Sequence, residues 1–181
     1  NFAIAPAPQA AVPVAGSSDS FPVRRIYCVG RNYAAHAREM GSDPDREPPF
    51  FFCKPADAVV PILPGVTTDV AYPPQTANYH HEIELVVAIG KGGRDIAAAD
   101  AFRHIYGYAI GLDMTRRDLQ GEAKKLGRPW CIGKGFDQSA PIGPITRAAE
   151  VPHIAQAAIW LQVNGAERQR SHVGQLIWGV P

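Results

Sequence analysis

The sequence has few cysteines, lacks a continuous apolar run of membrane-spanning length and shows no excess of either charge. Its three cysteines, Cys28, Cys53 and Cys131, are widely spaced and form no Cys-x-x-Cys pair. This pattern argues against a disulfide framework and against a zinc knuckle, and we expect a reducing, cytoplasmic setting. The first twenty residues lack a basic start followed by an apolar core, so neither a signal peptide nor a membrane partner is expected.

The balance of charge argues against polyanionic partners. Eighteen basic and seventeen acidic residues leave a net charge of +1, with no run of like charge. Binding to nucleic acid is therefore not expected, and small-molecule chemistry is favoured. A chain of 181 residues with 46% hydrophobic content predicts one core. Residues 1–20, rich in Ala and Pro, are expected to form an extended arm or short edge strand ahead of a main domain at 21–181.

The stretch from Tyr79 to Gly90 carries the clearest chemical signal. Its apolar, β-branched run predicts a buried strand, yet Glu82 and Glu84 lie near its start. Successive strand side chains alternate between faces, so these two carboxylates share a face with His80. Like charges on one buried face repel and are costly to desolvate unless a cation holds them together. The alternative is a pair of outward-facing residues on an edge strand.

Asp113 offers a third carboxylate, directly after a strand expected at residues 106–112. With the two glutamates it makes an all-oxygen ligand set, which selects magnesium, manganese or calcium. Zinc would require His80 or His81 in place of one carboxylate. The alternative is that Asp113 merely helps to cap the following helix.

A histidine and a glutamate near the N-terminal third of the chain form a candidate general base. A short helix expected at residues 33–40 places His36 and Glu39 three positions apart, on one face. A histidine that a carboxylate orients and charges is a usual general base. The alternative is a surface ion pair, which is common on helices.

Several cations are available to hold an anionic substrate. Lys134 lies between glycines in a strand expected at residues 130–137, where glycine often marks a bulge or a close approach of backbone to ligand. Lys54 follows a short buried strand expected at residues 50–53, where it either snorkels to solvent or holds an anion at the mouth of a metal site. The two arginines of this group are Arg31 and Arg117. Together these residues predict a metal-assisted enzyme that acts on a small, oxygen-rich anion, without naming the reaction.

The remaining elements complete a mixed, β-rich pattern. Helices are expected at residues 95–105 and 116–126, and the second starts with a capping-box-like Thr115 and Asp118. On that second helix a three- and four-residue spacing aligns Arg117, Gln120 and Lys124. Residues 158–163 followed by Asn164-Gly165 predict a β-hairpin, and residues 173–181 predict the start of a helix.

Several motifs, in order along the chain, resemble the fumarylacetoacetate hydrolase family. They are Cys28-Val29-Gly30-Arg31-Asn32-Tyr33 with His36 and Glu39, Phe52-Cys53-Lys54-Pro55, His81-Glu82-Ile83-Glu84-Leu85, Gly107-Tyr108 with Leu112-Asp113-Met114-Thr115-Arg116-Arg117-Asp118, and Gly133-Lys134-Gly135-Phe136-Asp137. The resemblance covers about residues 22–181. Within the family the chain is similar to the short bacterial acylpyruvate hydrolases.

The resemblance implies a fold and a set of site residues. The fold is a mixed α/β, β-rich roll with short helices, like the C-terminal domain of fumarylacetoacetase, in a homodimer. Magnesium or manganese is held at positions matching Glu82, Glu84 and Asp113. The resemblance also implies that His36 with Glu39 activates water or takes a proton and that Lys134 stabilises an oxyanion. Arg31, Arg117 and Gln120 fall at matching positions that contact substrate or shape the pocket. Lys54 joins the expected substrate-binding residues on the ground of its own place at a strand end.

The implied reaction is hydrolysis of the carbon–carbon bond of a 2,4-dioxo acid, such as fumarylpyruvate of gentisate breakdown, to pyruvate and a carboxylic acid. Decarboxylation of oxaloacetate and isomerisation of a hydroxymuconate-type diacid are alternatives that the same site could perform. A non-catalytic small-acid binding protein is an alternative of another class, and such a protein would not need the His36–Glu39 pair. The resemblance further implies a Gly-Thr-Pro-containing segment near the C-terminus that completes the sheet and lines the site, and this sequence does not contain it.

Overall fold

Short strands dominate the fold. The computed structural model describes residues 1–33 and 48–181. The strands are β1 (Ala11–Pro13), β2 (Ser20–Pro22), β3 (Ile26–Gly30), β4 (Phe50–Lys54), β5 (Val59–Pro61), β6 (Tyr79–His80), β7 (Ile83–Ile89), β8 (Ile105–Leu112), β9 (Thr115–Arg116), β10 (Ala140–Ile142), β11 (Thr146–Arg147), β12 (Ala158–Val163) and β13 (Ala166–His172). The helices are α2 (Arg117–Lys125), α3 (Cys131–Lys134) and the short 3-10 segments Ala56–Ala58, Ala98–His104, Ala148–Glu150, Ile154–Gln156 and Val173–Gln175.

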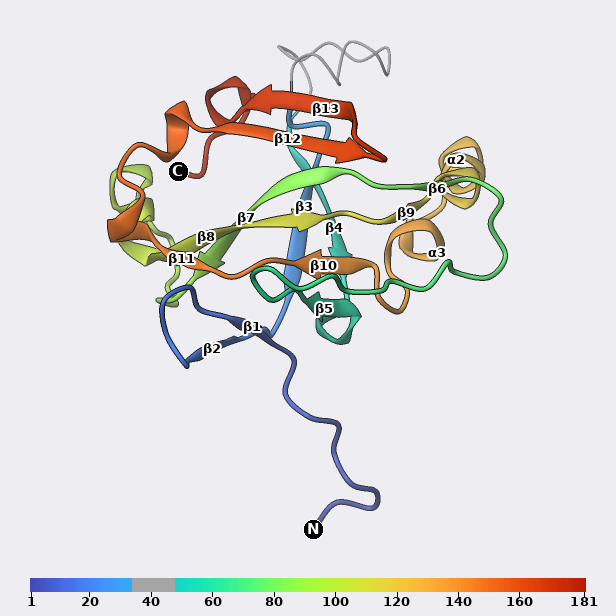
Figure 1. The fold of residues 1–181 in the computed structure, drawn as a ribbon, viewed down its shortest axis with the longest axis horizontal. Helices are drawn as coiled ribbons and strands as arrows, with labels where there is room; N and C mark the ends of the chain where they lie inside the picture. Colours follow the sequence, from blue (N-terminus) through green and yellow to red (C-terminus); the bar gives the residue numbers. More distant parts are fainter. Residues whose placement is uncertain (34–47) are drawn as a thin grey trace.

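The central sheet is built around β8. Its strand order is β11-β8-β10-β5, and β7 pairs with β8 along the opposite edge (Figure 1). The β10–β5 pair is parallel, whereas β8 is antiparallel to each of its neighbours. Gly107 allows β11 to approach, since a Cβ there would lie 2.2 Å from the carbonyl oxygen of Thr146. Among the described strands, β8 is the only one that pairs with β7.

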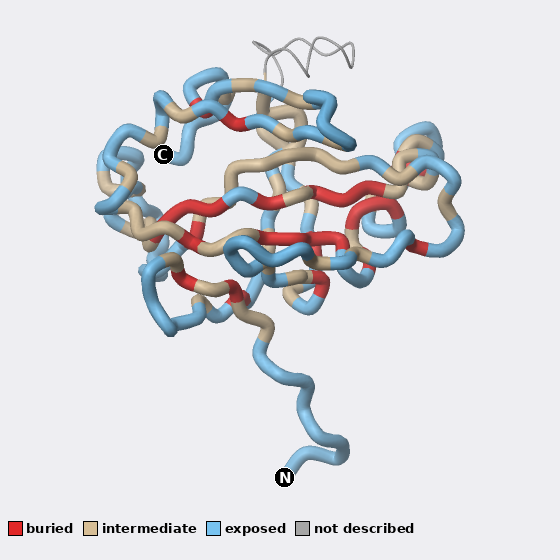
Figure 2. Tube along the Cα trace, viewed as in Figure 1, coloured by how far each residue is buried: buried red, intermediate tan, exposed pale blue. Residues whose placement is uncertain are grey.

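The hydrophobic core lies between this sheet and the N-terminal strands. Figure 2 shows the buried residues concentrated along β8, β10 and α3. The core cluster consists of Val12, Val23, Ala58, Ala88, Ala109, Ala140, Ile142 and Ile145. Val12 of β1 is only 1% exposed, so part of the segment expected as an arm lies inside the core. The first residues of the chain extend away from the body of the molecule (Figure 1), whereas Gln9 and Ala10, just before β1, hydrogen-bond to Val23.

The C-terminal hairpin forms where the sequence predicts it. Strands β12 and β13 are antiparallel and are joined by Asn164 and Gly165, both with positive φ (52° and 78°). Such a turn matches the twist of the flanking strands, which is why Asn-Gly predicts it so well. The hairpin packs against β7 (Figure 1).

Two of the expected strands take other forms. The stretch from Tyr79 to Gly90 is divided, since β6 pairs with β9 and β7 begins only at Ile83. Residues 130–137 were expected as a strand, but α3 is a helix there. The physical reason lies at Gly133, where a Cβ would meet the backbone nitrogen of Gln120 at 2.9 Å. The glycine beside Lys134 therefore permits the close approach of two helices rather than a bulge in a strand.

The expectation of a buried strand at residues 50–53 is also wrong in part. The strand is present as β4, but its residues alternate, and Phe51 is 61% exposed. Phe52 and Lys54 therefore point inward on one face of β4, while Phe51 and Cys53 on the other face are exposed.

Three helix expectations also need correction. Residues 95–105 form a 3-10 segment at Ala98–His104 instead of the expected helix, and Phe102 within it is 54% exposed. The capping box at the start of α2 is absent, because the Asp118 carboxylate instead accepts hydrogen bonds from Thr76 and Ala77. Residues 173–181 contribute one short 3-10 turn. In contrast, α2 lies where a helix is expected and ends before Gly127, which has φ +61°.

Within the described residues, none of the helices has the length and apolar content needed to span a membrane.

Candidate active site

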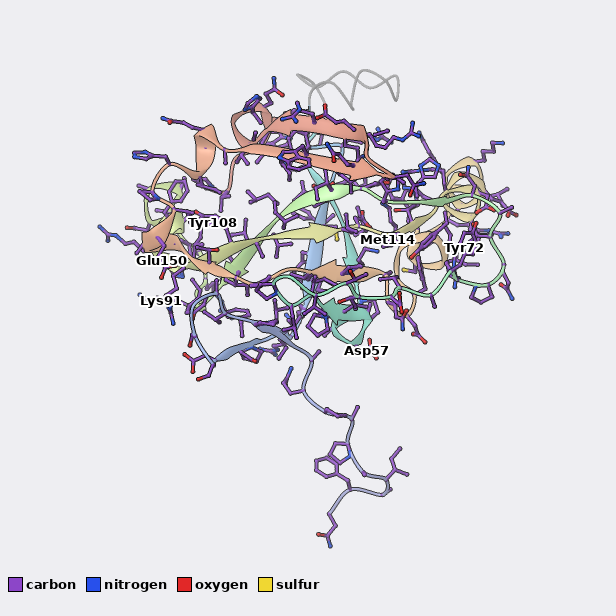
Figure 3. All side chains as sticks on the ribbon, in the orientation of Figure 1. Asp57, Tyr72, Lys91, Tyr108, Met114 and Glu150 are labelled. Atoms are coloured by element: carbon purple, nitrogen blue, oxygen red, sulfur yellow. The ribbon has the colours of Figure 1, made fainter. Side chains whose placement is uncertain are left out.

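The site forms where β8 ends and β7 begins. Asp113 follows β8, Glu82 precedes β7, and the backbone N–H of Asp113 donates to the Glu82 carbonyl at 2.8 Å. The antiparallel register of these strands, with Ile83 opposite Leu112, therefore brings together carboxylates that are distant in the sequence. Figure 3 labels Met114, the neighbour of Asp113, just beyond this end of β8, and Tyr108 within the strand. Strands β6 and β9 and helix α3 gather around it (Figure 1).

Lys134 lies at the centre of the cluster. Its ammonium Nζ donates to Glu82 Oε2 at 3.0 Å, to Asp113 Oδ2 at 2.6 Å and to Thr115 Oγ1 at 2.7 Å. The residue is only 2% exposed, and its Nζ also lies 4.9 Å from the centre of the Phe52 ring. Short charge-assisted bonds at this depth hold the ammonium group in one place. Two predicted metal ligands and the predicted oxyanion-stabilising lysine thus lie together.

Lys54 lies behind this cluster rather than at its mouth. Its Nζ contacts the carbonyl oxygens of Met114 at 3.0 Å and Lys134 at 2.5 Å, and Asp113 Oδ1 at 2.9 Å. The residue is 3% exposed, so its side chain does not snorkel to solvent. Burial lowers the pKa of Lys54, and the neighbouring Asp113 opposes that shift. A contact between Lys54 and substrate stays a prediction.

Glu82 faces two cations. Burial raises the pKa of its carboxyl group, but the charges of Lys134 and Arg117 outweigh burial, and the net shift is downward. Arg117 donates to Glu82 Oε1 through Nη2 and to Gln120 Oε1 through Nη1, the latter at 2.6 Å. Helix α2 positions this pair, because Arg117 and Gln120 are three residues apart on one face. Arg117 and Gln120, two of the four residues predicted to contact substrate or shape the pocket, therefore lie at the site, beside a predicted metal ligand.

Glu84 is the one of the three carboxylates that forms no ion pair within the described residues. Burial and the charges of Asp113 and Glu82 raise its pKa to about 8. Burial and Asp113 also raise the pKa of Cys28 to about 12, and burial and Glu84 raise that of Tyr33 to about 12. These shifts indicate that Cys28 and Tyr33 lie in the field of the same carboxylates. Without an added cation, Glu84 retains its proton at neutral pH.

The donor chemistry fits a hard divalent cation. Three carboxylates would supply oxygen ligands, and the fully buried Asp113 Oδ1 is contacted only by the Lys54 ammonium group, at 2.9 Å, within the described residues. Among those residues, however, no three Asp, Glu, His or Cys side chains already form a ligand cluster. Lys134 Nζ lies between Glu82 and Asp113, so these carboxylates must turn toward an ion for it to bind. Glu82, Glu84 and Asp113 stay predicted metal ligands.

Other predicted residues lie beside this cluster or outside the described part of the chain. His36 and Glu39 fall within residues 34–47, outside the described residues, and their roles stay predictions. The Arg31 guanidinium lies 5.4 Å from the Phe50 ring centre. His80 is exposed, and Arg117 Nε lies 3.4 Å from its Nδ1. Burial and Arg117 lower the His80 pKa.

Thr115 is a site residue that sequence reasoning missed. It is fully buried, accepts a hydrogen bond from Lys134 Nζ, and lies 3.3 Å from Glu82 Oε1 and 3.1 Å from the Asp113 carbonyl oxygen. Its place two residues after Asp113 was a usable signal, but a local capping role explained the same residue. Phe52 beneath Lys134 was missed for a similar reason, because an aromatic residue in a strand predicts only packing.

Comparison with solved structures shows close similarity. The crystal structure of fumarylpyruvate hydrolase from Pseudomonas aeruginosa, in complex with Mn2+ and pyruvate, is 64% identical with a TM-score of 0.97, over 99% of this chain and 77% of that one. A putative fumarylpyruvate hydrolase from Burkholderia cenocepacia is 54% identical with a TM-score of 0.87, over 99% of this chain and 75% of that one. These neighbours confirm the expected β-rich fold.

Sequence comparison leads to the same family. Mitochondrial oxaloacetate tautomerase of Bos taurus is 41% identical over 158 residues, 87% of this chain and 69% of the relative. An uncharacterized protein of Pyrococcus horikoshii is 43% identical over 157 residues, 87% of this chain and 66% of the relative. The chain thus spans about two thirds of the length of these relatives. The family model described as fumarylacetoacetate (FAA) hydrolase C-terminal matches residues 25–181, and the chain belongs to the fumarylacetoacetate hydrolase family.

Proposed function

We propose that this protein is a metal-dependent hydrolase that cleaves the carbon–carbon bond of an acylpyruvate, with fumarylpyruvate as the first candidate substrate. The observation that carries the proposal is the convergence of Glu82 and Asp113 on the buried ammonium group of Lys134, with the uncompensated Glu84 beside them. The similar Pseudomonas aeruginosa enzyme, crystallised with Mn2+ and pyruvate, supports both the metal and the product. The proposed setting is cytoplasmic breakdown of aromatic compounds by a homodimer.

Each group has a defined task in this reaction. Glu82, Glu84 and Asp113 would hold Mg2+ or Mn2+, which supplies Lewis-acid polarisation of the 2-oxo acid. His36, oriented by Glu39, takes a proton from water, and the resulting hydroxide attacks the 4-oxo carbon. The bond between carbons 3 and 4 then breaks, so the electron pair passes into the enolate of pyruvate, which is protonated at carbon 3. Lys134 donates a hydrogen bond to the developing oxyanion.

Arg117 is suited to bind the carboxylate end of the substrate. Its guanidinium group is held by Glu82 and Gln120 and is about a quarter exposed, so an incoming anion can reach it. A planar guanidinium group suits a carboxylate better than an ammonium group does, because it can donate two parallel hydrogen bonds.

A second candidate is tautomerisation or decarboxylation of oxaloacetate. The similarity to mitochondrial oxaloacetate tautomerase of Bos taurus and to mitochondrial oxaloacetate decarboxylase of Dictyostelium discoideum favours it. Both reactions also pass through an enolate that a cation and Lys134 would stabilise.

A substrate panel tests the proposal. Purified protein with Mn2+ or Mg2+ should consume fumarylpyruvate, measured as loss of its ultraviolet absorbance, and release one pyruvate per substrate. His36→Ala should abolish the reaction while leaving Mn2+ binding intact. Turnover of oxaloacetate alone would favour the second candidate. Binding of these acids without turnover would favour a non-catalytic binding protein.

A further inference from the structure

The peptide group between Glu82 and Ile83 is held from both sides. The Glu82 carbonyl oxygen accepts a hydrogen bond from the backbone N–H of Asp113 at 2.8 Å. The N–H of Ile83 donates to the side-chain oxygen Oε1 of Gln169 at 2.9 Å. This peptide group lies between the two glutamates, so its orientation helps to set the directions in which both side chains leave the backbone.

The position of β7 in the sheet explains why a side chain is needed there. The carbonyl and N–H of one peptide group point in opposite directions, so the N–H of Ile83 faces away from β8. Among the described strands, none pairs with β7 along that edge. Gln169 therefore supplies the acceptor that a neighbouring strand would otherwise provide.

The hairpin that carries Gln169 is irregular at this point. On β12, Leu161 lies opposite Gln169, while the next residue, Gln162, lies opposite Glu167. Arg168 is therefore the additional residue of a β-bulge. A bulge redirects neighbouring side chains, and Gln169 is half-buried whereas Arg168 beside it is exposed.

We propose that Gln169 is a positioning residue for the cation-binding carboxylates. It fixes the Glu82–Ile83 peptide group from the open edge of β7, so that Glu82 and Glu84 are presented together. The inference rests on the proposed function, because it concerns the same divalent cation. Gln169 acts through the backbone, and as a neutral amide it provides an acceptor without adding a fourth negative charge. Its bond spans 86 residues and links the hairpin to the site.

A substitution that removes only the acceptor tests this role. Gln169→Met has a similar length, so hydrogen exchange of the Ile83 amide in the metal-free protein should become about tenfold faster or more. The Glu84 amide, which the antiparallel alternation turns toward β8, is the internal control. The Mn2+ dissociation constant, measured by electron paramagnetic resonance, should rise about five- to tenfold. Gln162→Met, on the exposed side of β12, should change neither measurement.

Gln169→Glu retains an acceptor oxygen, and it should therefore restore protection of the Ile83 amide. Unchanged exchange or unchanged Mn2+ affinity in Gln169→Met would overturn the positioning role. If that variant does not fold, Gln169→Asn, which is one methylene shorter, replaces it with the same expected results. Glu84→Gln separates the two hypotheses. If the Mn2+ dissociation constant is unchanged in Glu84→Gln, the proposed function is refuted. If the constant rises in Glu84→Gln but is unchanged in Gln169→Met, only the positioning role is refuted.

Discussion

The site has a closed side and an open side, which differ in how far the protein compensates its own charges. On the closed side, Lys54, Asp113, Thr115 and Lys134 are all buried and contact one another. On the open side, Glu84 has a raised pKa and Arg117 is partly accessible to solvent. The closed side is therefore fixed by the protein alone.

The difference indicates where an added cation acts. Two ammonium groups already neutralise Asp113, so a divalent ion contributes most next to Glu84, whose proton it would displace. An enzyme gains from such an arrangement, because a rigid closed side keeps the reacting groups in place while the open side admits ion and substrate.

The largest effect is expected from Lys134→Met, which breaks the closed side. Turnover of fumarylpyruvate should fall about a thousandfold, since the proposed donor for the oxyanion is lost. In the metal-free protein the free energy of unfolding should also fall by about 3 kcal/mol, because Glu82 and Asp113 lose a shared buried cation. Chemical denaturation with and without Mn2+ measures this, and saturating Mn2+ should recover part of the loss.

Lys124→Met provides the matched control for that substitution. Lys124 lies exposed on α2, so stability and turnover should both stay close to those of the unmodified protein. A stability loss in Lys134→Met that equals the control would contradict the description of a closed side.

Lys54→Met separates structural support from substrate binding. The substitution leaves the carbonyl oxygens of Met114 and Lys134 without their buried donor, so unfolding should become easier by about 2 kcal/mol. The value of kcat should fall because Asp113 and α3 shift, while KM should change less than about threefold. Steady-state kinetics check the division between kcat and KM. A large rise in KM with normal kcat and stability would instead identify Lys54 as a substrate-binding residue.

Glu84→Gln tests the charge of the open side through pH. The pKa of Glu84 is about 8 in the folded protein against an ordinary glutamate value of 4.5, so the folded state binds the proton more tightly. The stability of the metal-free protein should therefore decrease as pH rises between these values, by about 1 kcal/mol per pH unit, and level off above them. Denaturation at several pH values should show this slope in the unmodified protein and a reduced slope in Glu84→Gln. Equal slopes would contradict the raised pKa.

The carboxylates and the lysines of the site differ in how well the sequence predicts them. Strand ends and a period of two identify Glu82, Glu84 and Asp113, because these signals are local. The depth of Lys54 was not predictable, since its partners Met114 and Lys134 lie 60 and 80 residues away.

The fold shows the same difference between features set by local sequence and features set by distant contacts. Asn164-Gly165 sets the hairpin turn by itself, so the sequence predicts it. The conformation around Lys134 depends on how closely α3 approaches Gln120 of α2. Gly133 allows this approach, but its local sequence is typical of a strand.

The smallest effect is expected from Asp118→Asn, at the rim of the open side. Hydrogen bonds from Thr76 and from the backbone N–H of Ala77 lower the Asp118 pKa and fix the segment before β6. A lowered pKa stabilises the protein above the normal aspartate pKa, and this stabilisation is lost as pH falls through the folded value. The melting temperature of Asp118→Asn should therefore be slightly lower at pH 7 and match that of the unmodified protein in strong acid, as thermal scans at several pH values would measure. Mn2+ affinity should stay unchanged, because the Asp118 carboxylate supports a loop and its replacement does not alter the charges around Glu84. A weaker Mn2+ affinity in Asp118→Asn would show that the open side extends to the start of α2.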